Sequence, residues 1–320
     1  MEVVSVTNLK KKYGEFLAVD HISFSIKQGE VFGFLGPNGA GKTSTINMMI
    51  GLSRPTGGHI EIFGIDAVKD VKKVQRIIGV VPDENNLYDE MNGFDNLCFC
   101  ASLYGISKAK REKRAVELLE QFNLTDAGKR PFKTYSKGMK RKLTIAAAII
   151  HDPKILFLDE PTTGIDVESA RQIRELILHL KNQGKTIFIT THYIEEAQRV
   201  CDRIAFIVKG RIVKIGSVRE LLENTEQEHK LKLKVAGSLN ELSGELKNHF
   251  QNFKLEILDE NSLLITSEER VTLSPIIRWL DSKGILVYEA REIKPSLEDV
   301  FVKITGSKAA QISGKEKVEM

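Results

Sequence analysis

The stretch 33-GFLGPNGAGKTST-45 places glycines, a lysine and hydroxyl side chains directly after an apolar run. Its middle matches the pattern G-x-x-x-x-G-K-[ST], in which glycines let the backbone bend so that successive amide hydrogens point at one anion. The helix expected to follow adds the positive end of its dipole. The stretch therefore predicts a phosphate cradle, and an accidental glycine turn is the alternative. The residues expected in the cradle are Gly36, Pro37, Asn38, Gly39, Ala40, Gly41, Lys42, Thr43 and Ser44.

A second group of candidate residues ends the run 155-ILFLDEP-161, whose apolar residues predict a buried strand. Side chains alternate along a strand, so Asp159 and Glu160 should face different directions. Lys42 should neutralise β- and γ-phosphate oxygens, while Thr43 and Asp159 offer the oxygen ligands that Mg²⁺ prefers. Glu160 is then free to orient and deprotonate the attacking water. An ordinary acidic turn after a core strand is the alternative.

His192 ends the next apolar run, 187-IFITTHY-193. A single histidine is usually a packed core or surface residue. This one lies at the carboxyl edge of the same predicted sheet, where α/β proteins build their sites. We therefore expect His192 to form a hydrogen bond with the γ-phosphate.

The elements that must position these residues alternate between strands and helices. Residues 1–32 contain three strand-like runs with turn residues between them, which favours antiparallel strands. Further along, near-continuous apolar runs alternate with segments of helical spacing, which predicts a buried parallel sheet. The predicted fold class is α/β, with a mainly parallel P-loop NTPase core and an antiparallel β subdomain in residues 1–220.

Two further regions complete the predicted organisation. Residues from about 92 to 150 have helical spacing, with a third helix starting at Ser136, and form a helical insert. Residues 225–305 follow the order β-α-β-β-α-β, which predicts a small α+β accessory domain of ferredoxin-like type. The tail, 306–320, is polar and should be flexible.

Composition limits the classes of protein to consider. The chain has 320 residues and a net charge of +4 with interspersed signs, which argues against a nucleic-acid-binding protein. Its three cysteines do not suggest a disulfide framework. The N-terminus lacks the features of a signal peptide, and no apolar run approaches the roughly 18 residues of a membrane span. If the protein acts at a membrane, another chain is expected to span it.

The cradle, the carboxylates and His192, in this order, resemble the ATP-binding subunits of ABC transporters over about residues 3–220. The resemblance implies that ATP and Mg²⁺ are the ligands. It also implies that Tyr13, in 11-KKYGEFLAVD-20, stacks on adenine, because an aromatic ring offers a favourable stacking face.

The same resemblance implies that two copies of the chain share each ATP. The segment 135-YSKGMKRKL-143 corresponds to the family signature and keeps Ser136 and Gly138. Ser136 should cap the helix that begins there and bind the γ-phosphate of ATP held by the second copy. Asp166, in 161-PTTGID-166, corresponds to the loop at the seam between the copies.

One position departs from the family pattern. In 80-VVPDENN-86, Asp83 stands where the family usually has glutamine. An aspartate can still ligate Mg²⁺ through oxygen, but it adds a negative charge near the phosphates. Asp83 could instead be offset from the metal, or Glu84 could substitute for it.

The run 292-EIKPSLEDVFVKITG-306 resembles the end of exporter ATPases of the daunorubicin-resistance type. This implies a subunit that powers export of a drug or other lipophilic substrate through a separate membrane permease. The helical insert and the 80–90 loop would grip the permease, with the chain peripheral at the cytoplasmic face of the membrane. The rival hypotheses are a soluble ABC-type regulator of ribosomes or DNA and a small-molecule P-loop kinase, and the kinase gives no reason for Ser136 and His192.

Overall fold

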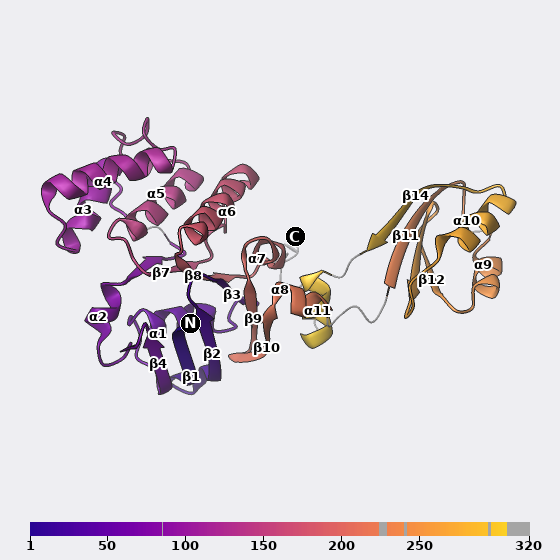
Figure 1. Cartoon of the computed structure of the whole chain (residues 1–320), viewed down its shortest axis with the longest axis horizontal. Helices are drawn as coiled ribbons and strands as arrows, with labels where there is room; N and C mark the ends of the chain where they lie inside the picture. Colours follow the sequence, from indigo (N-terminus) through magenta and orange to yellow (C-terminus); the bar gives the residue numbers. More distant parts are fainter. Residues whose placement is uncertain (85, 224–228, 240–241, 294–295, 306–320) are drawn as a thin grey trace, which may run out of the picture. The chain divides into compact units, whose positions relative to one another are not determined.

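The computed structural model describes residues 1–84, 86–223, 229–239, 242–293 and 296–305 (Figure 1). The chain forms two compact units. The first comprises Met1–Val218 together with the chain from Phe301, and the second comprises Arg219–Val300. The polar tail expected to be flexible, 306–320, lies outside the described residues.

An antiparallel sheet forms one layer of the first unit. Its strands are β1 (Glu2–Tyr13), β2 (Phe16–Lys27), β4 (Gly57–Ile62) and β5 (Ile65–Asp66), in the order β2-β1-β4-β5. Alternating burial along β1 and β2 gives the sheet one face toward the core.

A mixed sheet of six strands forms the second layer, in the order β10-β9-β3-β8-β7-β6. The strands are β3 (Val31–Leu35), β6 (Ile78–Val81), β7 (Ile155–Asp159), β8 (Thr186–Thr191), β9 (Arg203–Val208) and β10 (Arg211–Ser217). All described neighbours pair parallel except the hairpin β9–β10. That hairpin turns at Lys209 and Gly210, which have φ of 49° and 77°.

The expectation that the third N-terminal run is an antiparallel strand is wrong. β3 pairs parallel with β8 on one side and with β9 on the other. All five of its residues are buried, so it needs partners on both edges and cover on both faces. The core between the two sheets includes stacked rings of Phe24, Phe32 and Phe188, whose centroids lie 5.5–6.1 Å apart.

Helices connect and cover the mixed sheet. They are α1 (Lys42–Met49), α2 (Val71–Gln75), α3 (Gly93–Leu103), α4 (Lys108–Gln121), the 3₁₀ turn η1 (Phe132–Thr134), α5 (Lys137–Ile149), α6 (Val167–Asn182) and α7 (Ile194–Val200). Figure 1 shows α3, α4 and α5 gathered together at one end of the first unit. The described first unit therefore has the expected α/β architecture, with a largely parallel sheet, an antiparallel sheet and a helical segment between β6 and β7.

The second unit has the predicted order of elements. They are β11 (His229–Ala236), α9 (Ser243–His249), β12 (Lys254–Asp259), β13 (Ser262–Ser267), α10 (Leu273–Ser282) and β14 (Leu286–Ile293). The strands pair antiparallel in the order β12-β13-β11-β14. The buried core includes Leu233, Leu263 and Leu280. Two further helices are α8 (Val218–Glu223) and α11 (Leu297–Thr305), and Phe301 of α11 packs edge-on against Phe206 at 5.3 Å.

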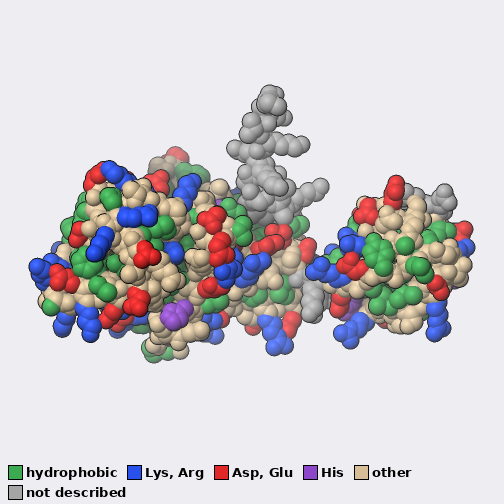
Figure 2. All heavy atoms as spheres, turned by 90° about the horizontal axis from the view of Figure 1, so that it is seen from above, with side chains coloured by type: hydrophobic (Ala, Val, Ile, Leu, Met, Phe, Trp, Pro, Cys, Tyr) green, Lys and Arg blue, Asp and Glu red, His purple; other side chains and the backbone are tan. Residues whose placement is uncertain are grey.

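The surface of the first unit mixes basic and acidic side chains on the face shown in Figure 2. Within the part of the chain that the structure describes, every helix is too short or too polar to cross a bilayer.

Candidate nucleotide site

The glycine-rich loop connects β3 to α1 and lies at the carboxyl end of the parallel strands. Beside it is a pocket of about 280 Å³. This volume is slightly below the roughly 300–1,000 Å³ of small-molecule pockets, so one chain offers only a small site. The lining residues are Phe16, Ala18, Asn38, Gly39, Gly41, Lys42, Thr43, Ser44, Asp83, Glu160, Thr163 and His192.

Two loop positions need glycine because other backbone atoms come close. A Cβ at Gly36 would overlap the carbonyl oxygen of Ile207, and one at Gly41 would overlap that of Ala18. Gly41 also has a φ of 105°. The loop therefore follows its path only because its neighbours can approach the bare backbone.

Gly41→Ala should lower the melting temperature of the nucleotide-free protein more than Gly39→Ala. Both positions have positive φ, 105° and 76°, and that conformation costs a non-glycine residue roughly 1–2 kcal/mol. Only position 41 adds the overlap with Ala18, since a Cβ at position 39 meets open space. Thermal unfolding without nucleotide measures the difference, and equal melting temperatures would contradict the close approach.

Lys42 points back into the loop and is 6% exposed. Its Nζ donates to the carbonyl oxygens of Gly36 at 2.8 Å and Pro37 at 3.3 Å. The same ammonium lies 3.2 Å from Oε1 of Glu160. A buried ammonium needs an anionic partner, and Glu160 supplies it here. Ala40, at the middle of the loop, is itself buried.

Glu160 follows β7 in a left-handed conformation, with a φ of 48°. Nδ1 of His192 lies 2.9 Å from its Oε2, and Oγ1 of Thr163 donates to the same oxygen at 3.1 Å. Burial alone would raise the pKa of this carboxyl, but the hydrogen bond from His192 and the charge of Lys42 outweigh it and lower the pKa. The side chain is thus an ionised carboxylate held at both oxygens.

Asp159 is buried and lies beside the hydroxyl groups of Thr190 and Thr43. Oγ1 of Thr190 donates to its Oδ1, and the nearby hydroxyl of Thr43 also acts to lower the pKa of Asp159. Burial raises the pKa of Asp159, and the neighbouring charge of Glu160 adds to the rise. Carboxylate and hydroxyl oxygens at a phosphate cradle suit Mg²⁺, which usually binds one or two carboxylates plus substrate phosphates. Thr43 and Asp159 therefore fit the ion.

Asp83 lines the same pocket, in the segment after β6. Its side chain is 55% exposed, and its Oδ1 lies 3.8 Å from a guanidinium nitrogen of Arg141. Glu84, the considered substitute, is exposed and is not among the pocket residues. The carboxylate of Asp83 thus has a defined cationic neighbour that sequence inspection missed.

The aromatic residue that lines the pocket is Phe16, whereas Tyr13 is not among the lining residues. The two residues pair across the turn between β1 and β2. Phe16 is 64% exposed, and the ring of Tyr13 lies under Nζ of Lys11 at 4.7 Å. Both rings lie at the tip of one hairpin beside the pocket, and the sequence analysis overlooked Phe16.

The structure brings Ser136, Gly138 and Asp166 together, but none of them lines the pocket with Lys42. Ser136 caps α5 by accepting from the amide of Met139 at 3.2 Å. Asp166 caps α6 and accepts from Oγ of Ser169 at 2.7 Å. A Cβ at Gly138 would overlap that Ser169 side chain. These three residues form a second cluster on the same chain.

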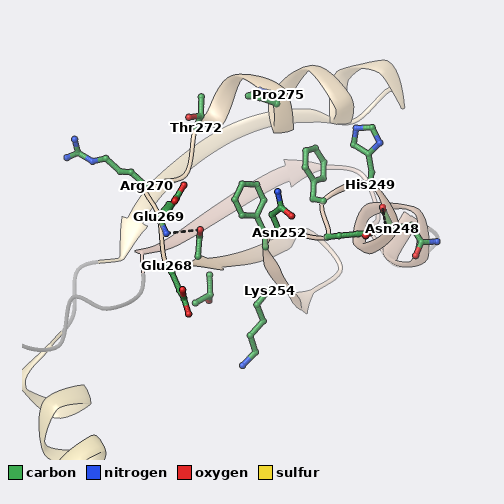
Figure 3. Close-up of a pocket in the computed structure, with 14 residues that line it drawn as sticks. Asn248, His249, Asn252, Lys254, Glu268, Glu269, Arg270, Thr272 and Pro275 are labelled. Carbon is green, nitrogen blue, oxygen red and sulfur yellow. Dashed lines mark hydrogen bonds between the residues drawn. The ribbon is translucent and has the colours of Figure 1, made fainter.

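A larger cleft of about 1120 Å³ lies in the second unit and has different chemistry. The partly buried rings of Phe250 and Phe253 stack at 6.2 Å and line it. Figure 3 shows His249 on one side and Glu268, Glu269 and Arg270 on the other. Size alone does not identify the nucleotide site, because the phosphate-binding loop and the carboxylates surround the smaller pocket.

The loop between β3 and α1, the two carboxylates at the end of β7 and the histidine after β8 define a P-loop nucleotide-hydrolysing site. A family model described as ABC transporter matches residues 19–163. The linearmycin resistance ATP-binding protein LnrL of Bacillus subtilis is 34% identical over 306 residues, 95% of this chain and 98% of that protein. The chain belongs to the family of ABC transporter ATP-binding proteins.

Other relatives agree with this assignment. The daunorubicin resistance ATP-binding protein DrrA3 of Streptomyces coeruleorubidus is 34% identical and matches 95% of this chain and 96% of its own length. Among solved structures, a dimeric post-hydrolysis state of the ATP-binding cassette MJ0796 with ADP and Pi has a TM-score of 0.62 and 28% identity. It covers 68% of this chain and 99% of that one. The protein is thus an ATP-binding and ATP-hydrolysing subunit of an ABC transporter, similar to drug-resistance exporter ATPases, as the sequence predicted.

Proposed function

We propose that two copies of the chain bind two ATP molecules between them and power export through a separate membrane permease. The observation that carries this proposal is the separation of two clusters on one chain. Lys42 and Glu160 line a small pocket, whereas Ser136 and Asp166 lie outside it. A second copy in the opposite orientation would supply the missing half.

The contacts of Lys42 suggest how ATP activates the site. Phosphate oxygens entering the loop compete with Glu160 for the buried ammonium, because a phosphate carries more charge than one carboxylate. Oε1 of Glu160 is then released, while His192 and Thr163 still hold Oε2. The freed oxygen could then take a proton from water, and His192, which lines the same pocket, would be the candidate partner of the γ-phosphate.

Thr43 and Asp159 would hold Mg²⁺, with Asp83 at the edge of the same pocket. When bound, the ion neutralises part of the phosphate charge as it develops. Asp159 is kept in place for this role by the hydroxyl of Thr190. Tyr13 and Phe16 are the candidate rings for adenine, because both lie at the hairpin tip beside the pocket.

The shared site predicts that Ser136→Asp prevents ATP-dependent dimerisation. Aspartate is as good an N-cap as serine, so α5 should keep its start, but its charge would repel a γ-phosphate from the other copy. In a Glu160→Gln background with ATP, sedimentation should give a monomer for Ser136→Asp and a dimer for the control Ser136→Thr. A dimer of unchanged affinity in both variants would contradict a phosphate contact by Ser136.

A permease helix has a candidate site on the first unit. A groove of about 1220 Å³ runs past α2, β6 and the end of α3. Leu52, Leu103 and Tyr104 line it and are 72%, 70% and 44% exposed. Lys72 and Arg76 add basic charge at its edge. An apolar groove of this kind suits one face of an amphipathic helix.

Leu103→Glu should reduce the amount of integral membrane protein that co-purifies from detergent-solubilised membranes. A carboxylate in the apolar groove would have to be desolvated by the incoming helix. Val213→Glu, at an exposed position of β10 outside the groove and the helical insert, is the matched control and should leave recovery unchanged. Recovery of ribosomes or nucleic acid instead of a membrane protein would favour the soluble-regulator hypothesis.

The names of the relatives suggest a lipophilic cargo, since they are described by resistance to linearmycin, daunorubicin and doxorubicin. We place the chain at the cytoplasmic face of the membrane through its permease, with residues 1–220 as the ATPase domain and 225–305 as the accessory domain.

A further inference from the structure

The nucleotide pocket has three carboxylates around it and two buried cations. Asp159 and Glu160 are buried, and Asp83 is half exposed at the pocket edge. One cation is Lys42, which contacts Glu160. The other is Arg141 on α5, which is 5% exposed; it lies within the signature segment, but the sequence analysis gave it no role.

Arg141 connects α5 to the segment that carries Asp83. Its guanidinium donates to the carbonyl oxygens of Pro82 at 2.5 Å and Asp83 at 2.7 Å. These acceptors are neutral, so they satisfy its hydrogens without balancing its charge. A carboxylate oxygen, Oδ1 of Asp83, lies 3.8 Å from one of its guanidinium nitrogens, which is too far for a hydrogen bond but close enough for a Coulomb interaction.

The charge of Arg141 also acts on the other two carboxylates. Burial lowers the pKa of its guanidinium, while Asp83, Asp159 and Glu160 all oppose that shift. A buried cation without compensation is costly, and three carboxylates around a polyphosphate are costly too. Placing Arg141 near the carboxylates lowers the free-energy cost of burying the cation and the repulsion between the carboxylates and the phosphates.

We propose that Arg141 is a positioning residue that compensates the charge of Asp83 and so permits an aspartate beside the phosphates. The inference rests on the proposed Mg²⁺-nucleotide site. Because Arg141 and Ser136 share α5, the same side chain joins the pocket of one ATP to the cluster proposed to contact the other.

The experiment measures ADP dissociation constants by calorimetry for wild type, Arg141→Met, Asp83→Asn and the double variant, each with EDTA and with Mg²⁺. In EDTA, Arg141→Met should weaken binding on the order of tenfold, because Asp83 then repels the phosphates without compensation. The loss should be smaller with Mg²⁺, which supplies positive charge itself. Asp83→Asn alone should bind at least as tightly as wild type.

The double variant distinguishes charge compensation from a purely structural role. If charge is the cause, adding Asp83→Asn to Arg141→Met restores wild-type affinity for ADP, although the hydrogen bonds from Arg141 to both carbonyl oxygens remain lost. Arg141→Lys, which keeps the charge with fewer donors, should also bind near the wild-type affinity. Lys142→Met, at the next position of the same helix, is the matched control and should have no effect, since its described partner is Gln172.

Two results would overturn the inference. One is a double variant that binds as weakly as Arg141→Met, and the other is Arg141→Lys behaving like Arg141→Met. Melting temperatures of the nucleotide-free variants show which of them fold. If Arg141→Met does not fold, Arg141→Lys still tests the inference, because weaker binding than wild type by a folded Arg141→Lys would contradict it. Failure of the nucleotide site itself would appear separately, as unchanged binding in Lys42→Ala.

Discussion

Glu160→Gln is expected to slow ATP hydrolysis by about 10²–10⁴-fold while ATP remains bound, which is the usual contribution of a positioned general base. Glutamine keeps the shape and can still accept from Thr163, but it cannot take a proton from water. It also removes the charge that competes with phosphate for Lys42. Single-turnover hydrolysis and equilibrium binding of ATP measure the two effects separately.

Glu175→Gln is a suitable control, because this carboxylate lies on α6 and pairs with Arg171 at 2.5 Å. Its hydrolysis rate should match that of the unaltered protein. Wild-type hydrolysis by Glu160→Gln would remove Glu160 from the role of base, and loss of ATP binding would show that it serves the cradle instead.

Lys42→Ala is expected to weaken nucleotide binding by roughly 10–150-fold, which corresponds to the roughly 1.5–3 kcal/mol of a hydrogen bond to a charged group. Lys42 is the only lysine among the described residues that line the pocket. Its removal also leaves Glu160 with His192 and Thr163 as neighbours. Titration with a fluorescent ATP analogue gives the dissociation constant.

The matched control is Lys108→Ala, an exposed lysine at the start of α4. It should bind the analogue like the unaltered protein. Undiminished binding by Lys42→Ala would contradict the assignment of the loop as a phosphate cradle, provided that both variants retain the melting temperature of a folded protein.

Local patterns were enough to predict much of the fold and the motifs of the site. The strand-loop-helix around Lys42, the apolar strand before Asp159 and the cap at Ser136 each depend on residues within a few positions. The β-α-β-β-α-β order of the second unit also follows from spacing along the chain. These features were predictable because their physical causes are local.

The remaining features depend on contacts between distant residues. β3 joins the parallel sheet through partners such as Ile187, about 150 positions away, which its own composition could not reveal. Arg141 meets Asp83 across 58 positions. Phe16 and Tyr13 pair across one hairpin, and only the folded chain shows that Phe16 lines the pocket whereas Tyr13 does not. Short helices such as α2 and α8 were also missed, because they span few residues and have little periodicity.

The close packing of Gly138 against Ser169 changes how the signature segment should be interpreted in related proteins. A side chain at position 138 would push apart the starts of α5 and α6, whether or not any nucleotide is present. Selection for a folded subunit is then enough to retain this glycine, even in a paralogue that has lost hydrolysis. Ser136, whose capping role asparagine or aspartate could fill, is the better diagnostic of an active partner surface.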